Sequence, residues 1–252
     1  MTKGGGSTPP DLLIDADILL YRAAAACEKE VLWDDVNHVL SANREESWEA
    51  VIRQMETYRA ACGPGQMYFA LSGPGAMNFR RVLYPEYKAG RSRKPLCYGY
   101  IMERLESEFP TKRVDSIEAD DLLGIWATGG KLNRPIIISA DKDLKTIPGR
   151  VYREGEILTV TEQDADYFWM FQTLTGDIVD GFKGLPGCGA KGAEKILNGK
   201  GTLEEMWAAV VSAYHAKDLK FEDALLQARL ARILRSSDWD SKRKEVILWN
   251  PK

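Results

Sequence analysis

Histidine is scarce in this sequence, and cysteine is present but never paired, which excludes several kinds of site. There are two histidines, His38 and His215, and neither stands near a cluster of acidic residues. The four cysteines lie far apart and form no C-x-x-C motif, so the pattern indicates neither a zinc ribbon nor a disulfide framework. We therefore expect a reducing environment such as the cytoplasm.

Long hydrophobic runs are also missing. Hydrophobic residues make up 44% of the chain and charged residues 28%, but no apolar run approaches the roughly 18 residues that a membrane-spanning helix needs. The first ten residues, MTKGGGSTPP, lack the basic and then apolar order of a secretory signal, and they predict a flexible tail over 1–10. We expect a soluble protein without a membrane partner.

Short apolar runs that alternate with amphipathic segments indicate the fold. Strands are predicted where an apolar run ends at an acid or a loop, at 12–15, 67–71 and 134–139. Helical spacing of apolar residues predicts helices at 45–62, 98–109, 118–127 and 164–176. This alternation predicts an α/β fold with a mostly parallel sheet covered by helices on both faces.

The pattern changes after Gly176. A glycine-rich stretch, GLPGCGAKGAEKIL, enters a helix, and helical periodicity continues to about Arg235. We therefore expect an α/β core at 11–175 and a C-terminal helical region at 176–252. A chain of 252 residues is long enough for one α/β body with a small extension.

Acidic residues stand at the ends of the predicted elements. They follow strands, open a helix or follow the motif LTG: Asp15, Glu118, Asp120, Asp121, Asp141, Asp143, Asp177 and Asp180. The carboxyl ends of parallel strands form one ligand crevice, so we expect these acids to converge. Like charges about 4 Å apart repel by roughly 4 kcal/mol at an effective dielectric near 20, whereas a helix dipole offsets only about 0.3–1 kcal/mol per acid. A bound cation would stabilise such a cluster.

The ligand set predicts which cation. Carboxylate oxygens without histidine or cysteine suit Mg²⁺ or Mn²⁺, whereas zinc favours nitrogen and sulfur. Two such ions about 3.5–4 Å apart activate a water and stabilise a leaving oxygen, so the pattern indicates metal-assisted attack on phosphate. Each acid pair also has a plainer interpretation as a helix cap or a turn former, although Asp15 fits it less well because it interrupts an apolar run.

The overall charge hides a basic segment. The net charge of −3 argues against a nucleic-acid partner, but without the eight acids the chain holds 34 basic residues against 37 − 8 = 29 acidic ones, a surplus of five. Much of that surplus lies in FRRVLYPEYKAGRSRKP, at 79–95, where six basic residues accompany one acid, Glu86. The six are Arg80, Arg81, Lys88, Arg91, Arg93 and Lys94.

Five motifs, taken in order, resemble those of the flap endonuclease or 5′ nuclease family. They are LLIDADILLYR, FRRVLYPEYKAGR, IEADDLLG, IISADKDLKTI and TGDIVDGFKGLPGCGAKGAEKIL, and they span roughly Leu12 to Leu197. The resemblance implies a PIN-like core and a metal-dependent phosphodiesterase that cuts DNA near a 5′ end, at a flap or at a single-strand/duplex junction. RNA/DNA hybrids are a further candidate substrate, and we expect a monomer acting in a bacterial cytoplasm or a phage-infected cell.

The resemblance also implies roles for the acids and for the basic segment. Ligands of a first ion, or their neighbours, would be Glu118, Asp120, Asp121 and Asp141, and ligands of a second ion would be Asp143, Asp177 and Asp180, with Asp15 in the same cluster. Lys88 and Arg91 match a catalytic lysine and arginine within an arch-like segment at about 79–112. Such cations stabilise charge that develops on phosphate oxygens.

Further residues are expected to contact DNA. The basic segment offers Arg80, Arg81, Tyr87 and Lys94, and the tyrosines Tyr84, Tyr87 and Tyr98 either stack on unpaired bases or simply pack. The stretch GLPGCGAKGA resembles a helix–three-turn–helix, in which Gly187, Gly189 and Lys191 would hold a DNA phosphate, with K⁺ as a possible companion ion. Such contacts would recognise DNA by shape and not by sequence.

The chain departs from the family pattern at two positions. Gly73 stands where the family usually has an aspartate, and Asp17 is a candidate to compensate for it. Gly181 stands where relatives often carry asparagine after the last acid. A glycine has no side chain to hydrogen-bond and orient the neighbouring metal ligands.

Three other functions fit parts of the sequence. A catalytically impaired junction-binding protein is suggested by Gly73, and tight DNA binding without cleavage would indicate it. The motifs LLIDADIL and GDIVD are also similar to those of haloacid-dehalogenase phosphatases, which would hydrolyse small phosphate esters and leave DNA intact. A PIN-type ribonuclease would prefer RNA to DNA.

Overall fold

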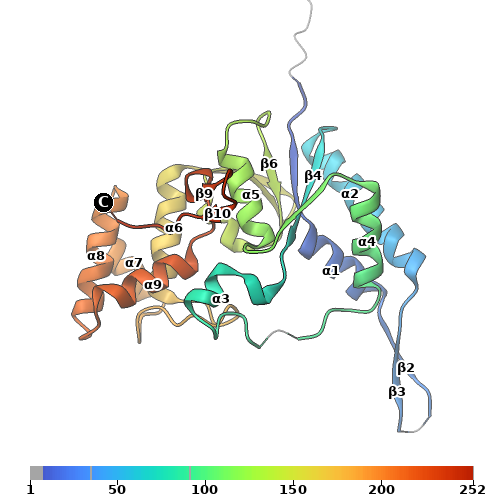
Figure 1. Ribbon diagram of the computed structural model, residues 1–252, viewed down its shortest axis with the longest axis horizontal. Helices are drawn as coiled ribbons and strands as arrows, with labels where there is room; N and C mark the ends of the chain where they lie inside the picture. Colours follow the sequence, from blue (N-terminus) through green and yellow to red (C-terminus); the bar gives the residue numbers. More distant parts are fainter. Residues whose placement is uncertain (1–7, 35, 91, 252) are drawn as a thin grey trace, which may run out of the picture.

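Short buried aliphatic runs form the central sheet of the computed structural model, which describes residues 8–34, 36–90 and 92–251 (Figure 1). The predicted catalytic residue Arg91 and most of the predicted tail lie outside these described residues. The sheet has six strands in the order β5-β4-β1-β6-β7-β8, and only β8 is antiparallel to its neighbour. The strands are β1 Leu12–Asp15, β4 Met67–Ser72, β5 Thr111–Val114, β6 Ile136–Ile138, β7 Gly149–Arg153 and β8 Glu156–Val160.

Alternation along the strands divides the core between the two faces of the sheet. On β1, Leu12 and Ile14 pack into one apolar cluster with α1 Ala16–Cys27, α2 Arg44–Cys62 and α4 Tyr98–Glu108. Leu13 points the other way and packs with α5 Ala119–Thr128. Successive side chains of a strand point to opposite faces, so β1 is buried on both sides. The predicted α/β class, with helices on both faces of a mostly parallel sheet, is confirmed.

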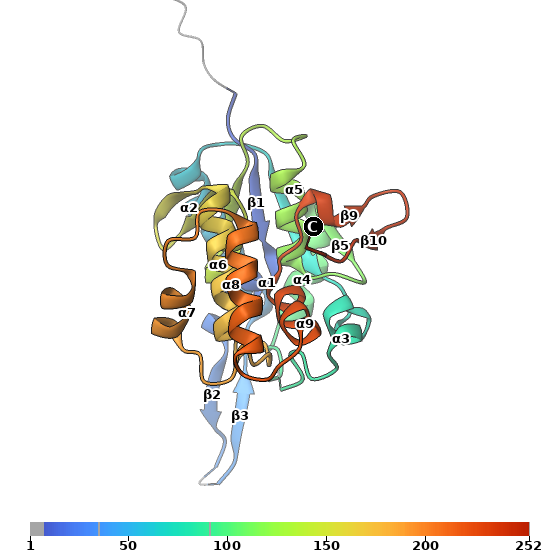
Figure 2. The same cartoon turned by 90° about the vertical axis from the view of Figure 1, so that its left-hand side faces the viewer.

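A second helical layer stands beside the sheet (Figure 2). It consists of α6 Glu162–Thr175, α7 Ala190–Leu197, α8 Leu203–His215 and α9 Phe221–Ala231. Trp169, Trp207 and Trp249 meet edge to face, with ring centroids 4.7 and 5.1 Å apart, in the core of this layer. Helix α6, which the sequence analysis placed at the end of the α/β core, packs against α7, α8 and α9. Within the described residues, no helix is long and apolar enough to cross a membrane.

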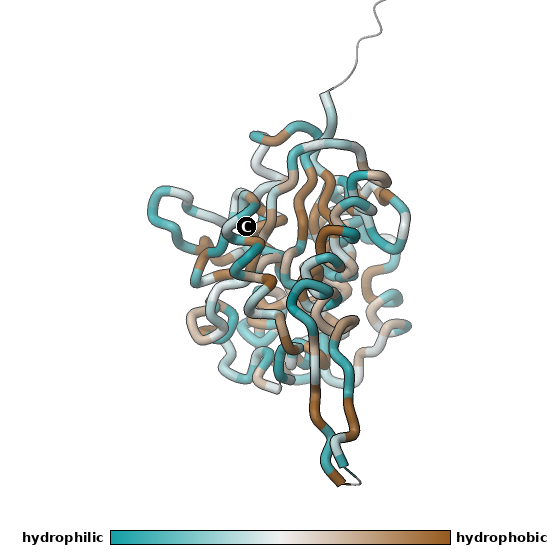
Figure 3. Tube along the Cα trace, turned by 90° about the vertical axis from the view of Figure 1, so that its right-hand side faces the viewer, coloured by the Kyte–Doolittle hydropathy of each residue, from teal (hydrophilic) through white to brown (hydrophobic). Residues whose placement is uncertain are grey.

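A β-hairpin that the sequence analysis did not predict projects from the body (Figure 3). Its strands, β2 Lys29–Leu32 and β3 His38–Ser41, pair antiparallel, and every residue in them is exposed. Its exposed apolar residues include Trp33 at 78% and Val36 at 82%. Isolated two-stranded hairpins bury little, so this one contributes little to the core.

The remaining elements are short, and one buried segment joins the two layers. The elements are the α-helix α3 Phe79–Leu83, the 3₁₀ segments η1 Gly75–Met77, η2 Lys142–Thr146 and η3 Ser236–Asp238, and the hairpin strands β9 Trp239–Asp240 and β10 Glu245–Val246. After α9, residues 232–235 are buried, and we call them the strap. The strap passes so close to α5 that a Cβ built on Gly124 would lie 2.3 Å from the Leu234 carbonyl oxygen.

Gly124 therefore provides a test of this packing. Gly124→Ala should lower the free energy of unfolding by about 1–3 kcal/mol, because either the strap or α5 must move, and movement of a packed backbone is costly. Gly99→Ala on α4 is the matched control, since a Cβ there meets nothing within 4 Å, and it should be neutral or slightly stabilising. Urea unfolding measures both, and equal stability of the two variants would contradict the close packing.

Candidate active site

Asp15 stands at the carboxyl end of β1 and begins the site. It caps α1, because its Oδ1 accepts a hydrogen bond from the Ile18 amide at 3.1 Å, and its Oδ2 accepts one from the Ser139 hydroxyl at 2.7 Å. Burial raises the pKa of Asp15 to about 7, and the charges of Asp17 and Asp141 add to this rise. Because β1 and β6 are paired in parallel, Asp15 and Asp141 lie at the same edge of the sheet, where the strands have their carboxyl ends.

Asp141 and Asp143 reach the same edge from the end of β6. Asp141 caps η2 by accepting a hydrogen bond from the Asp143 amide at 2.8 Å. Burial, followed by the charge of Asp141, raises the pKa of Asp143 to about 7. On α5, burial and the charges of Asp15 and Asp141 raise the pKa of Asp120 well above its usual range. These carboxylates are near enough to repel one another.

Asp177 and Asp180 enter from a tight turn after α6. Asp177 and Phe182 exchange main-chain hydrogen bonds of 2.9 and 3.1 Å, which close the turn. Lys142 donates a hydrogen bond of 3.1 Å to Asp177, and although burial opposes it, this contact keeps the pKa of Asp177 below its usual value. The charges of Asp177 and Asp180 both act on Asp143, so the turn belongs to the same site.

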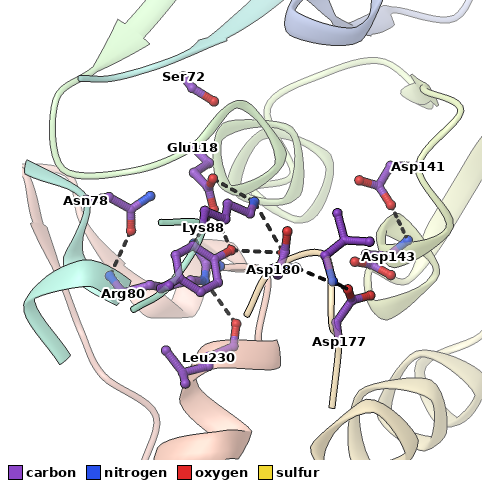
Figure 4. A network of polar contacts seen from close by, with 12 residues as sticks. Ser72, Asn78, Arg80, Lys88, Glu118, Asp141, Asp143, Asp177, Asp180 and Leu230 are labelled. Carbon is purple, nitrogen blue, oxygen red and sulfur yellow. Dashed lines mark hydrogen bonds and ion pairs between the residues drawn. The ribbon is translucent and has the colours of Figure 1, made fainter. Parts of the chain in front are cut away.

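Lys88 lies between Glu118, at the N-cap of α5, and Asp180 of that turn (Figure 4), and Tyr87 contacts the same two acids. The Lys88 Nζ lies 2.8 Å from Glu118 and 3.3 Å from Asp180, and the Tyr87 hydroxyl donates to the same two carboxylates at 2.9 and 3.1 Å. Burial would raise the pKa of Glu118, but Lys88 and Arg80 outweigh it and lower that pKa to about 2. Glu118 is therefore held ionised by neighbouring cations.

Arg80 and Asp121 form a buried ion pair, and this corrects two predictions. The Arg80 side chain donates to both oxygens of Asp121 at 2.7 Å and also to the carbonyl oxygens of Leu230 and Arg232. Asp121 is fully buried and also accepts from the Leu234 amide. The prediction that Arg80 contacts DNA is wrong because its guanidinium is turned inward, and Asp121 has no oxygen left for an ion. Both residues instead fasten α5 to the strap.

The other predicted DNA contacts differ in accessibility. Tyr87 is only 3% exposed and packs in the helical core, so the structure supports packing, the second of its two alternatives, and contradicts the prediction that it contacts DNA. Arg81 donates to the main-chain oxygens of Tyr87 and Lys88, which fixes the segment that carries Lys88. Lys94 lies over the Tyr98 ring, 3.8 Å from its centroid, and 3.9 Å from Asp17.

Residues 187–191, which we call the glycine-rich hairpin, lie at the surface where α7 starts. Gly189 is the N-cap of α7, Gly187 has a φ of 74°, and Lys191 is exposed in the first turn. The amides at a helix start are not all used within the helix, so a bound anion is stabilised there. The three residues predicted to hold a phosphate thus lie together on the surface.

Gly73 has no room for the acid that the family pattern has there. A Cβ at Gly73 would lie 2.3 Å from the Val114 carbonyl oxygen and 2.6 Å from the Asp115 Cα, because the backbone that leaves β5 passes directly against the end of β4. Asp17 does not replace that acid directly, since its oxygens accept hydrogen bonds from the Ser72 amide at 3.1 Å and the Tyr98 hydroxyl at 2.8 Å. The backbone explains the departure at Gly73, and Asp17 ties α4 to β4.

Seven carboxylates remain at the site, and we call them the acid cluster. They are Asp15, Glu118, Asp120, Asp141, Asp143, Asp177 and Asp180. Within the described residues, Arg80, Lys88 and Lys142 bond to members of this cluster, fewer cations than carboxylates. Oxygen donors with surplus negative charge fit Mg²⁺ or Mn²⁺.

The acid cluster is spread more widely than a closed metal cage. Among the described side chains, no three His, Cys, Asp or Glu residues are placed so that they alone hold an ion. Hydrogen bonds explain the spacing, because Ser139 holds Asp15 and Gln172 holds Asp143. Mg²⁺ usually keeps several waters and takes one or two carboxylates together with substrate phosphates, so an open arrangement suits it.

The amino-acid sequence is similar to those of known exonucleases and flap endonucleases. Residues 11–165 match the family model described as 5′-3′ exonuclease, N-terminal resolvase-like domain. The exonuclease of Escherichia phage T7 is 30% identical over 285 aligned positions, which cover 95% of this chain and 93% of that protein. The flap endonuclease Xni of Aeromonas salmonicida is 31% identical over 67% of this chain and 72% of its own length.

Solved structures resemble the fold. A bacteriophage T5 protein crystallised with metal ions has a TM-score of 0.66 at 15% identity, over 88% of both chains. The bacteriophage T5 flap endonuclease in a complex with DNA and metal ions has a TM-score of 0.61, also at 15% identity and over 88% of both chains. At this identity the likeness concerns the fold alone.

The ion pair of Arg80 and Asp121 can be tested by a double-mutant cycle. Arg80→Met should lower the free energy of unfolding by about 3–5 kcal/mol, because it leaves Asp121 buried without its cation. Asp121→Asn should lower the free energy of unfolding less in the Arg80→Met protein than in the wild type. The difference between the two effects, which is the coupling energy of the pair, should be at least about 1 kcal/mol. Chemical denaturation gives all four stabilities.

Arg81→Met is the control for this cycle, since Arg81 bonds to main-chain oxygens and not to a buried acid. It should cost less than half as much as Arg80→Met. If Arg80→Met stays within about 1 kcal/mol of the wild type, the pair does not carry the stability assigned to it.

Proposed function

Because this chain belongs to the 5′-3′ exonuclease family, a family of DNA-cutting hydrolases, we propose that it is a structure-specific 5′ nuclease that uses two divalent ions. The reaction is the hydrolysis of DNA phosphodiesters, by 5′–3′ exonuclease action, flap cleavage or both. One observation carries the proposal, namely that acids from four separate parts of the chain gather at one edge of the sheet, where the cations of the described residues are fewer than the acids.

The acid cluster divides into two groups that would each hold one ion. Asp15, Asp120 and Asp141 act on one another electrostatically, and Glu118 stands beside them on the N-cap of α5. Asp143 is linked in the same way to the two acids of the 177–182 turn. When bound, Mg²⁺ or Mn²⁺ would neutralise these acids, activate water for attack and stabilise the charge on the leaving oxygen. Asp121 is not a member of either group.

Lys88 is the residue of this chain that is placed to assist the phosphate. It has a φ of 53°, and its ammonium group lies between Glu118 and Asp180 at the rim of the site. A cation fixed there stabilises negative charge that grows on phosphate oxygens in the transition state more than it stabilises the bound substrate. We propose that Arg91 also stabilises charge on the phosphate, because its position in the sequence matches the catalytic arginine of the family.

The glycine-rich hairpin would bind the DNA backbone away from the cut. Lys191 and the amides at the start of α7 would contact one phosphate, and K⁺ is proposed as a companion ion at the carbonyl groups of the hairpin. Such contacts read the shape of the duplex and not its sequence. The proposed substrates are DNA with a 5′ end, a flap or a single-strand/duplex junction, together with RNA/DNA hybrids. We propose a monomer that acts in the cytoplasm.

One observation favours a second function, a DNA-junction-binding protein with impaired catalysis. The backbone at Gly73 is pressed against Val114 and Asp115, so a carboxylate cannot be accommodated at a position where the family usually has one. Cleavage of flap DNA in Mg²⁺ or Mn²⁺ separates the two functions, because the binding protein would hold the DNA without cutting it.

Asp141→Asn tests the role of the acid cluster. The variant should cut a 5′-labelled flap substrate more than about 100-fold more slowly than the wild type, because one electrostatic group at a reacting centre contributes about that much. Gel analysis of product against time in Mg²⁺ and in Mn²⁺ provides the measurement. Asp218→Asn, at an exposed position after α8, should cut at the wild-type rate. Full activity of Asp141→Asn would contradict the assignment.

Lys191→Ala tests the proposed backbone contact. Removing one phosphate contact should weaken flap-DNA binding similarly for all sequences and reduce the slope of log K against log salt by about 1. Fluorescence anisotropy across a salt series, without divalent ions, gives both values. Lys112→Ala on the edge strand β5 is the control and should leave the slope unchanged. Identical slopes for wild type and Lys191→Ala would refute the contact.

A further inference from the structure

Two aliphatic side chains stand almost fully exposed between two members of the acid cluster. Ile178 is 98% exposed and Val179 82% exposed, and they lie between Asp177 and Asp180 in the chain. Single exposed apolar residues are common on protein surfaces and need no explanation. Here two adjacent β-branched residues occupy the tip of a turn whose neighbouring side chains all belong to the site.

The turn is held in place without these two side chains. The Asp177 Oδ1 accepts hydrogen bonds from the amides of Val179 at 2.8 Å and Asp180 at 3.2 Å. Phe182, which is 3% exposed, anchors the end of the turn in the helical core and exchanges main-chain hydrogen bonds with Asp177. The apolar tip is therefore presented on a fixed backbone, and its side chains contribute little to folding.

The tip is also fixed relative to Lys88. The Lys88 amide donates a hydrogen bond of 2.9 Å to the Asp180 carbonyl oxygen, in addition to the contact between their side chains. Gly181 has a φ of 80°, and a Cβ there would lie 3.0 Å from the Glu86 carbonyl oxygen, so the two segments touch. Asp180, Lys88 and Phe182 line one cavity with Glu118, Asp120 and Asp143. Ile178 and Val179 directly precede the lining residue Asp180 in the chain.

We propose that Ile178 and Val179 contact the nucleobase of a nucleotide next to the cleaved bond and so help to select and position the substrate. The inference rests on the proposed nuclease function and adds a substrate contact to it. The acid cluster repels phosphates, whereas the face of a base is uncharged and gains from contact with aliphatic groups. This attraction does not need divalent ions and tolerates any sequence, because every base has an apolar face.

The test combines a double variant with modified DNA. Ile178→Ser/Val179→Ser should weaken binding of a labelled flap substrate in EDTA about tenfold, as expected when two aliphatic side chains that are partly covered by one base lose roughly 55 Å² of buried apolar surface. The unfolding midpoint should be unchanged, since neither side chain is packed. Val36→Ser, at an equally exposed position of the β2–β3 hairpin, is the matched control and should bind within about twofold of the wild type.

Abasic nucleotides then identify the contacted group. A series of substrates each carries one abasic nucleotide, at a different position around the cleaved bond. With the abasic nucleotide at the contacted position, wild type and double variant should bind with equal affinity. At every other position the tenfold difference in affinity should remain. The proposal is overturned if the double variant binds like the wild type. It is also overturned if its tenfold defect persists on every abasic substrate, because the contact would then be with sugar or phosphate.

Failure of this inference is distinguishable from failure of the proposed function. If the wild type cuts flap DNA in Mg²⁺ but the double variant has the wild-type affinity in EDTA and the wild-type KM, only the base contact is wrong. If the wild type binds flap DNA without cutting it in Mg²⁺ or Mn²⁺, the nuclease function fails, and the EDTA binding series still decides the base contact. A wild type that does not bind flap DNA overturns both.

Discussion

Repulsion among carboxylates at one edge of the sheet is the constraint on which the site depends. The parallel strands deliver Asp15 and Asp141 to neighbouring positions, and α5 adds Glu118 and Asp120. Among the described residues, Lys88, Lys142 and Arg80 neutralise part of this charge. Burial, together with the charges of neighbouring acids, raises the pKa of both Asp15 and Asp120. Such a site is costly to form, and divalent ions together with phosphate would relieve the cost.

The ion pair of Arg80 and Asp121 keeps this edge in place. It joins three parts of the chain, because Arg80 lies on α3 and Asp121 on α5, and each also bonds to the segment that follows: Arg80 to the carbonyl oxygens of Leu230 on α9 and Arg232 on the strap, and Asp121 to the Leu234 amide of the strap. The strap follows directly from α9, so the helical layer that carries the glycine-rich hairpin is fixed to the helix that presents Glu118 and Asp120. A DNA molecule held at the start of α7 would thus be held at a defined distance from the acids.

Much of this arrangement was predictable from sequence, and the exceptions have physical reasons. The gathering of acids follows from strand polarity, since Asp15 ends the buried parallel strand β1 and Asp141 follows the buried parallel strand β6. Arg80 and Asp121 were misassigned because charge pattern does not reveal burial, and a basic residue in a basic segment resembles a DNA contact. The β2–β3 hairpin was missed because its apolar residues face solvent. The strands β7 and β8 were not predicted, although β-branched and aromatic residues on both sides of a turn at Gly155 are typical of a β-hairpin.

The most direct measurement of the central claim is the stability of Asp120→Asn with and without Mn²⁺. If burial and neighbouring acids make Asp120 costly and ions relieve this cost, the variant should be more stable than the wild type in EDTA. The buried Asp120 must either stay charged beside Asp15 and Asp141 or take up a proton, and asparagine avoids both costs. It should also gain less stability than the wild type when Mn²⁺ is added, since an ion that binds the native state stabilises it more when its affinity is higher. An Asp120→Asn protein that is less stable in EDTA and gains as much from Mn²⁺ as the wild type would contradict the account.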